Sequence, residues 1–90
     1  MNTNDRKKVL NELMHEVTLY NDECIYMKTF CNSDQDMWSN ANAKRRKILH
    51  RLRGMIDIAN ICDKRYVYRL EYAGVGMFDC MRLDVEKVEG

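Results

Sequence analysis

The chain has 90 residues, with 15 lysines and arginines against 14 aspartates and glutamates, and a formal net charge of +1. This balance excludes a bulk polyanion-seeking surface and an acidic mimic of nucleic acid, so we expect any electrostatic role to be local. A chain of this size predicts one domain over residues 1–90 that buries about two thirds of its unfolded surface, so self-association would help its marginal stability.

Apolar residues recur at 3-4 spacing in two consecutive segments, the pattern of a helical seam. The first segment predicts a helix over residues 5–31, capped by Thr3 or Asn4, with these seam positions: Leu10, Leu13, Val17, Tyr20, Cys24, Met27 and Cys31. The second predicts a helix over residues 34–61, started by a capping box of Ser33 and Asp36, with these seam positions: Trp38, Ala41, Arg45, Ile48, Leu52, Met55 and Ala59.

The connection between these segments is short, because only Asn32 and Ser33 are plausible turn residues. The two helices must therefore fold back as a long antiparallel hairpin in which Val17 faces Leu52. Arg45 is the polar exception in the seam. We expect it to pair with Asp22 or Glu23 and fix the register, or to form with Tyr20 a small pocket for an anionic group of a partner.

The end of the second helix is apolar on more than one side, which predicts that a further element covers it. The residues concerned are Met55, Ile56, Ile58, Ala59, Ile61 and Cys62. Gly54 lies inside the same helix at a cost of about 1 kcal/mol relative to alanine, which suggests that something approaches its backbone closely.

Period-2 alternation of apolar and polar residues predicts strands over residues 65–73 and 77–88, joined by a turn at 73–76. The fold class is therefore α+β, a long antiparallel αα-hairpin followed by a β-hairpin, in the order α-α-β-β. A two-stranded sheet alone is marginal, so either the helices cover it or a second copy extends it.

Residues 44–53 contain seven basic or potentially basic side chains within ten positions. The predicted register places Glu23 beside Arg46 and Glu16 beside Arg53. A stripe on the outward side then has no assigned acidic partner: Lys44, Lys47 and Arg51. It is a solvated face, a contact for phosphates, or a contact for an acidic protein surface.

The tip of the hairpin gathers aromatic and methionine side chains far from the predicted sheet. Two helices cannot bury all of them, and such clusters are typical of partner or dimer contacts. The predicted contact residues are Tyr26, Phe30, Met37 and Trp38. Alternatively, Trp38 packs on Cys31 and water covers the rest.

No pattern typical of a catalytic site is present. Neither His15 nor His50 falls beside a cysteine or serine as base and nucleophile would. Gly74 and Gly76 lie in a turn between strands, whereas a phosphate loop leads into a helix. We therefore expect no enzymatic activity, no cofactor and no small-molecule ligand.

The cysteines lack zinc-site spacing, so we expect no metal. No apolar leader opens the chain, and no run approaches the ~18 apolar residues that span a bilayer. We expect a cytoplasmic protein without a membrane partner, with four reduced cysteines that act as small core hydrophobes: Cys24, Cys31, Cys62 and Cys80.

These features together predict a small protein–protein interaction module, a homodimer that also regulates or inhibits a larger protein. Compact chains of this kind include those carried by phages and mobile elements, and the asparagine-rich, proline-free composition is compatible with such an origin. The alternative is a nucleic-acid-binding protein that uses the basic helix 44–53.

Overall fold

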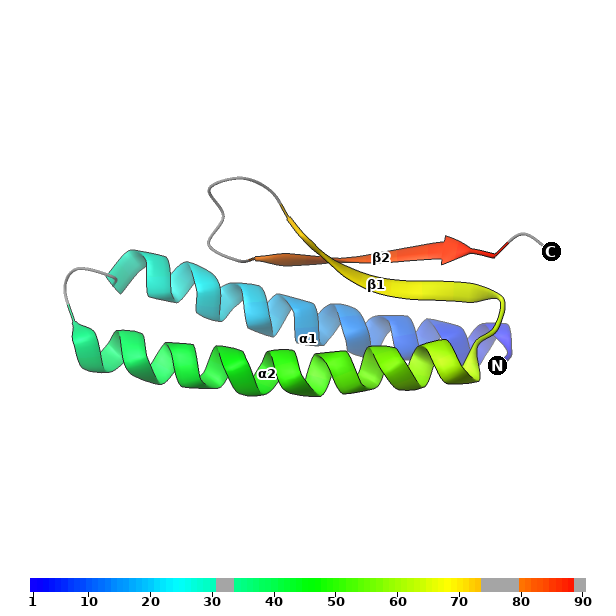
Figure 1. Cartoon of the computed structure of the whole chain (residues 1–90), viewed down its shortest axis with the longest axis horizontal. Helices are drawn as coiled ribbons and strands as arrows, with labels where there is room; N and C mark the ends of the chain where they lie inside the picture. The colour runs from blue at the N-terminus through cyan, green and yellow to red at the C-terminus, as the bar shows by residue number, and fades with distance from the viewer. Residues whose placement is uncertain (31–33, 74–79, 89–90) are drawn as a thin grey trace.

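A computed structural model describes residues 1–30, 34–73 and 80–88 of the chain. Two long helices, α1 (Thr3–Phe30) and α2 (Gln35–Cys62), precede two strands, β1 (Tyr66–Tyr72) and β2 (Met81–Lys87) (Figure 1). The predicted α-α-β-β order of an α+β fold is confirmed. Both observed strands are shorter than the predicted ranges 65–73 and 77–88, and residues 74–79 lie outside the described part.

Asparagine and aspartate side chains begin both helices, one residue or more from the predicted caps. Asn2 Oδ1 accepts the backbone N–H of Asp5 at 2.8 Å, so α1 begins earlier than residue 5. Asp34 Oδ1 accepts the N–H groups of Asp36 and Met37, each at 3.1 Å, so Asp34 is the N-cap of α2. The predicted capping box is therefore wrong. Residues 31–33 lie outside the described part.

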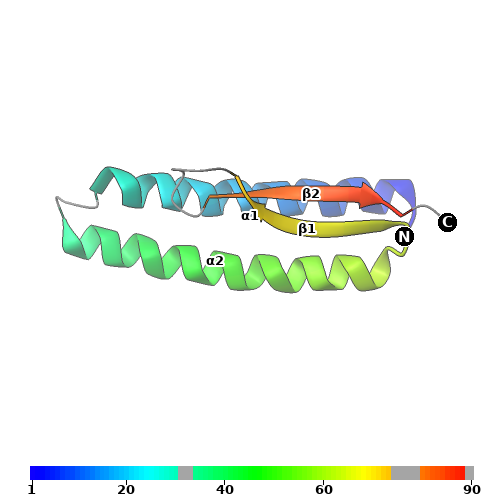
Figure 2. The ribbon, with the colours of Figure 1, turned by 45° about the horizontal axis from the view of Figure 1, so that its top comes forward.

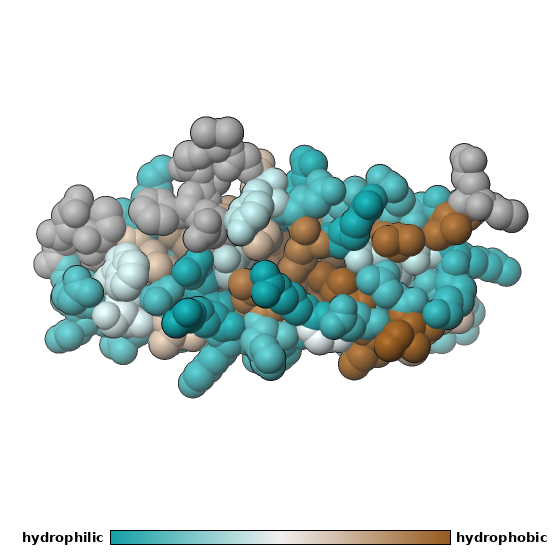
Figure 3. Space-filling view, viewed as in Figure 1, coloured by the Kyte–Doolittle hydropathy of each residue, from teal (hydrophilic) through white to brown (hydrophobic). Residues whose placement is uncertain are grey.

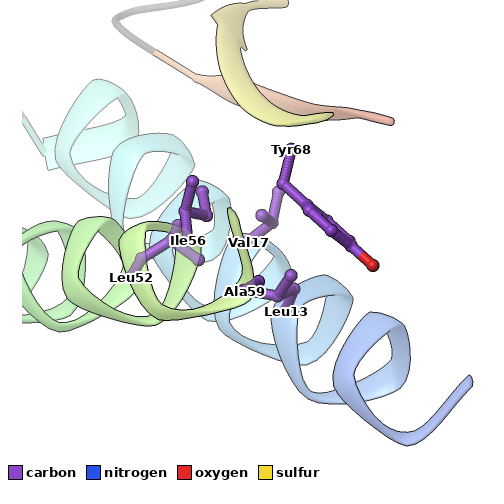
Figure 4. Packing of buried hydrophobic residues seen from close by; sticks show 6 residues of the cluster. All are labelled: Leu13, Val17, Leu52, Ile56, Ala59 and Tyr68. Atoms are coloured by element: carbon purple, nitrogen blue, oxygen red, sulfur yellow. The ribbon is translucent and has the colours of Figure 1, made fainter. Parts of the chain in front are cut away.

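The sheet lies along one face of the antiparallel helix pair, beside the N-terminal part of α1 and the C-terminal part of α2 (Figures 1 and 2). Between these layers, Leu83 and Val85 of β2 pack against one buried cluster drawn from α1, α2 and β1: Leu13, Val17, Leu52, Ile56, Ala59 and Tyr68. Figure 4 shows the Tyr68 ring descending from its strand toward the helices. The predicted proximity of Val17 and Leu52 is confirmed, because both belong to this cluster.

A second buried cluster lies at the start of β2 and contains Tyr20, Cys24, Cys80 and Met81. Burial raises the pKa of the Cys24 thiol, and burial raises the pKa of Tyr20 to about 12. Cys24 and Cys80 therefore act as core residues, as predicted. Cys62 is exposed, so that part of the prediction is wrong.

The antiparallel register of the sheet runs from Tyr66 opposite Lys87 to Tyr72 opposite Met81. Its outer face carries cross-strand ion pairs, with Arg69 2.9 Å from Glu86 and Arg82 2.9 Å from Glu71. This face is polar, whereas Tyr68 on the opposite face is buried. The alternation predicted from the sequence follows from this one-sided burial.

The sheet does not cover every apolar side chain at the end of α2. Ile56 and Ala59 are buried, but Ile58 is 62% exposed and Ile61 is 67% exposed. Figure 3 shows an apolar area at this end of α2, at the lower right. The prediction that a further element covers all these apolar residues is wrong. A two-stranded sheet packs against one face of a helix, and Ile58 and Ile61 lie outside that face. A Cβ built on Gly54 would also meet nothing within 4 Å, so no close approach occurs there.

Neither described helix combines length with enough apolar character to cross a lipid bilayer.

Candidate functional site

A buried carboxylate joins three elements at the base of the hairpin. Asp63 is 2% exposed and follows the last residue of α2. Its Oδ2 accepts from Arg6 Nε at 2.7 Å and from the Tyr68 hydroxyl at 2.6 Å. Its Oδ1 accepts from Arg6 Nη2 at 3.2 Å and from the Arg65 N–H at 3.3 Å. The carboxylate is thus fully engaged by donors from α1, the turn and β1.

The hydrogen bonds from Arg6, followed by those from Tyr68 and Arg65, hold the pKa of Asp63 well below its usual range. Burial and the adjacent carboxylate raise the pKa of Tyr68 to about 12. The Arg6 guanidinium also lies 4.3 Å from the centre of the Tyr66 ring. A fully bonded carboxylate with a depressed pKa is a structural tie, and no pattern in the sequence predicted it.

The face of the helix pair that points away from the sheet, here called the back face, carries two hollows. The hollow near the tip has a volume of about 390 Å³ and is lined by Asp22, Glu23, Tyr26, Met37, Asn40, Ala41 and Lys44. The hollow near the base has a volume of about 240 Å³ and is lined by Met1, Val9, Glu12, Leu13, Met55, Ile58, Ala59 and Cys62. Neither lining includes a strand residue, which places both away from the sheet.

The tip hollow brings together two of the predicted contact residues. Tyr26 is 37% exposed and lines the hollow with Met37. Trp38 is half-buried and does not line it. The side chain of Phe30 and the whole of Cys31 lie outside the described part, so the predicted packing of Trp38 on Cys31 falls there too.

The predicted stripe of unpartnered cations is wrong at one position. Arg51 donates to Glu16 Oε2 from Nε at 3.0 Å and from Nη2 at 2.6 Å. Lys44 lines the tip hollow with Glu23, and Lys47 is exposed. The stripe therefore lies beside the acidic side chains of α1.

Arg53, predicted beside Glu16, lies instead on the sheet side of α2. With Arg45, Arg46 and Tyr72 it lines a hollow of about 200 Å³. Tyr72 is 66% exposed there. The predicted pairs of Glu16 with Arg53 and of Glu23 with Arg46 are therefore wrong, because α2 presents Arg46 and Arg53 to the sheet and Lys44 and Arg51 to the back face.

Arg45 lies between the helices as predicted, with different partners. It donates to the Tyr20 hydroxyl at 3.3 Å and to Asn42 Oδ1 at 2.9 Å. Among the described residues, these groups take the place of Asp22 and Glu23, which we expected there. Tyr20 and Arg45 therefore do lie together, as the alternative prediction required.

Within residues 1–30, 34–73 and 80–88, no three histidine, cysteine, aspartate or glutamate side chains gather as metal ligands would.

Comparison of the chain with protein-family models, with curated proteins and with solved structures finds no match.

Proposed function

We propose that this protein is a small, non-enzymatic protein–protein interaction module that regulates or inhibits a larger partner. Chains of this size and composition include those of phages and mobile elements, and we extend that origin to this one as part of the proposal. The observation that carries the proposal is the tip hollow, where Tyr26 and Met37 line one surface with the charged side chains of Asp22, Glu23 and Lys44.

This arrangement has the anatomy of a protein interface. Interfaces bury aromatic and methionine side chains at their centre and keep charged groups at the rim. The Tyr26 ring supplies apolar area with a hydroxyl that can donate or accept, and the Met37 side chain can adapt to a partner's shape. The charges beside them would favour one orientation of the partner.

The test is affinity capture of protein from the source cells, followed by measurement of binding to the captured partner after its identification. Tyr26→Glu should weaken that binding at least about tenfold, because it places a charge in the desolvated centre of the contact. Ile25→Glu is the matched control, since Ile25 is 51% exposed and does not line the hollow. Equal affinities of the Tyr26 variant and the wild type would contradict the proposal.

The second candidate function is nucleic-acid binding by the basic helix 44–53. The observation that favours it is the hollow on the sheet side, where Arg46 and Arg53 lie beside exposed Tyr72. Arginine contacts to phosphate combined with stacking of a base on an aromatic ring are typical of single-strand binding.

A salt titration with a single-stranded oligonucleotide separates the two candidates. Phosphate contacts predict a steep loss of affinity with salt, with a slope that falls by roughly 0.7 for each contact removed, as in Arg53→Glu. Absence of oligonucleotide binding at low salt would remove this candidate and leave the protein-binding proposal in place.

A further inference from the structure

The charges of the back face are sorted by helix. Its acidic side chains belong to α1: Glu12, Glu16 and Glu23. Its basic side chains belong to α2, where Lys44 lines the tip hollow and Arg51 bonds to Glu16. Glu16 and Glu23 therefore each lie beside a base of α2, whereas Glu12 lies beside the apolar lining of the base hollow. One edge of the face is negative and the other is positive.

We infer that a second copy of this chain covers the back face, related to the first by a two-fold axis parallel to the helices. The four helices then form a bundle, with one sheet on each outer side. This inference rests on the proposed function in treating the back face as a protein-binding surface, and the second copy and the larger partner would then occupy the tip hollow in turn, never together.

The separation of acids on α1 from bases on α2 favours a two-fold axis parallel to the helices. Rotation about an axis parallel to the helices places α1 against α2 of the second copy at the same level, so Glu16 approaches Arg51 and Glu23 approaches Lys44 across the interface. Rotation about an axis perpendicular to the helices would place α1 against α1, and acids would face acids. Juxtaposed like charges disfavour that arrangement. The same acids disfavour nucleic acid on this face.

The apolar residues fit the same arrangement. The chosen axis brings base to base, so the hollow lined by Met55, Ile58 and Cys62 meets its own copy. Ile58, which is 62% exposed in one chain, then lies in an apolar contact.

The size of the face also suits a stable dimer. A helix of 28 residues is ~42 Å long, and two neighbouring helices are ~20 Å wide. The face therefore offers about 800 Å² per copy, the area of a standard specific interface.

The test uses two variants that each give the back face a single sign. The acid-row variant carries Glu16→Lys and Glu23→Lys, and the base-row variant carries Lys44→Glu and Arg51→Glu. Both should fold, because these exposed or partly exposed pairs contribute little to stability, and circular dichroism checks this. The control variant carries Arg82→Glu and Lys87→Glu, which change an ion-paired arginine and a lysine on β2.

Light scattering coupled to size-exclusion chromatography reads the mass of each sample. We expect a dimer for the wild type and the control, a monomer for each row variant, and a dimer again when the two row variants are mixed in equal amounts. A wild-type monomer at about 100 μM, well above a micromolar dissociation constant, would overturn the inference. So would a row variant that stays dimeric. Either outcome leaves the regulatory proposal to be decided separately by the Tyr26 capture experiment.

Discussion

At the scale of single residues, Asp63 links α1 to β1, because its carboxylate bonds to Arg6 of α1 and to Tyr68 of β1. Sequence periodicity could not predict this tie. It requires knowing that the first turn of α1, the end of α2 and the middle of β1 meet at one point. The seam was predictable from the sequence because Val17 and Leu52 each belong to a series of apolar residues at 3-4 spacing.

Asp63→Asn keeps the shape of the side chain and removes the charge opposite Arg6. We expect the free energy of unfolding at pH 7 to fall by about 3 kcal/mol, because breaking a buried ion pair leaves the other charge uncompensated. Urea unfolding followed by circular dichroism measures this change. Asp57→Asn, on the exposed surface of α2, should change it by less than about 0.5 kcal/mol. An equal loss in both variants would show that the tie is unimportant.

The depressed pKa of Asp63 also sets the sign of a pH effect. The unfolded carboxyl binds protons more readily than the native one, so its contribution to stability is complete above its ordinary pKa of 3.8. That contribution falls as the pH drops below this value toward the native pKa. Between pH 5 and pH 3, wild-type stability should therefore fall more steeply than that of Asp63→Asn. Parallel curves over this range would contradict the assignment.

Gly54→Ala should stabilise the protein. Gly54 is an exposed interior residue of α2 and an added Cβ meets nothing within 4 Å, so the expected gain is the helix propensity difference of about 1 kcal/mol. Thermal unfolding should show a rise in Tm of roughly 4–8 °C. A lower Tm would mean that the backbone at this position needs the freedom of glycine.

At the scale of elements, one asparagine from each helix holds the outer edge of one strand. Asn60 of α2 accepts from the Tyr68 N–H at 2.8 Å and donates to the Tyr68 carbonyl at 3.0 Å. Asn21 of α1 accepts from the Met81 N–H at 2.8 Å and donates to the Met81 carbonyl at 2.7 Å. These bonds satisfy backbone groups that face away from the other strand.

The pair of bonds from each asparagine is here called an asparagine clamp. Removing one clamp should loosen the strand that it holds. Asn21→Ala leaves both Met81 backbone groups without their side-chain partner, at a cost of about 1–3 kcal/mol. Hydrogen exchange should then be faster at the Met81 amide, with Asn40→Ala, an exposed substitution on α2, as the control. Unchanged protection at Met81 would show that the clamp does not hold β2.

Helices and strands were predictable from the sequence because each shows a characteristic spacing of apolar residues along neighbouring positions. The asparagine clamps were not, because Asn21 and Asn60 look like ordinary polar residues until the sheet is in place. The predicted ion pairs between the two helices were wrong for a related reason. Arg51 and Arg53 are two residues apart and lie on opposite sides of α2, so predicting the partner of Glu16 requires knowing which of those sides Glu16 faces.

At the scale of the whole molecule, the chain is elongated, with extents of 51, 22 and 17 Å. Its sheet covers one side of the helix pair and leaves the back face without cover from the described residues. From the sequence, we expected a marginal two-stranded sheet to be stabilised in one of two ways, by cover from the helices or by extension with a second copy. The asparagine clamps occupy part of both sheet edges, which favours a second copy at the back face over one at an edge.

The most direct measurement of this assembly is the distance between spin labels on Cys62 of the two copies, by double electron–electron resonance. A Cys31→Ser background directs the label to exposed Cys62, since Cys24 and Cys80 are buried. An axis parallel to the helices brings both bases to the same end, where facing helices lie ~10 Å apart. We therefore expect label distances below about 30 Å. Size-exclusion chromatography of the labelled protein checks that a label on Cys62, which lines the base hollow, leaves the dimer intact. Distances above ~40 Å, the length of a helix, would contradict the dimer proposed above.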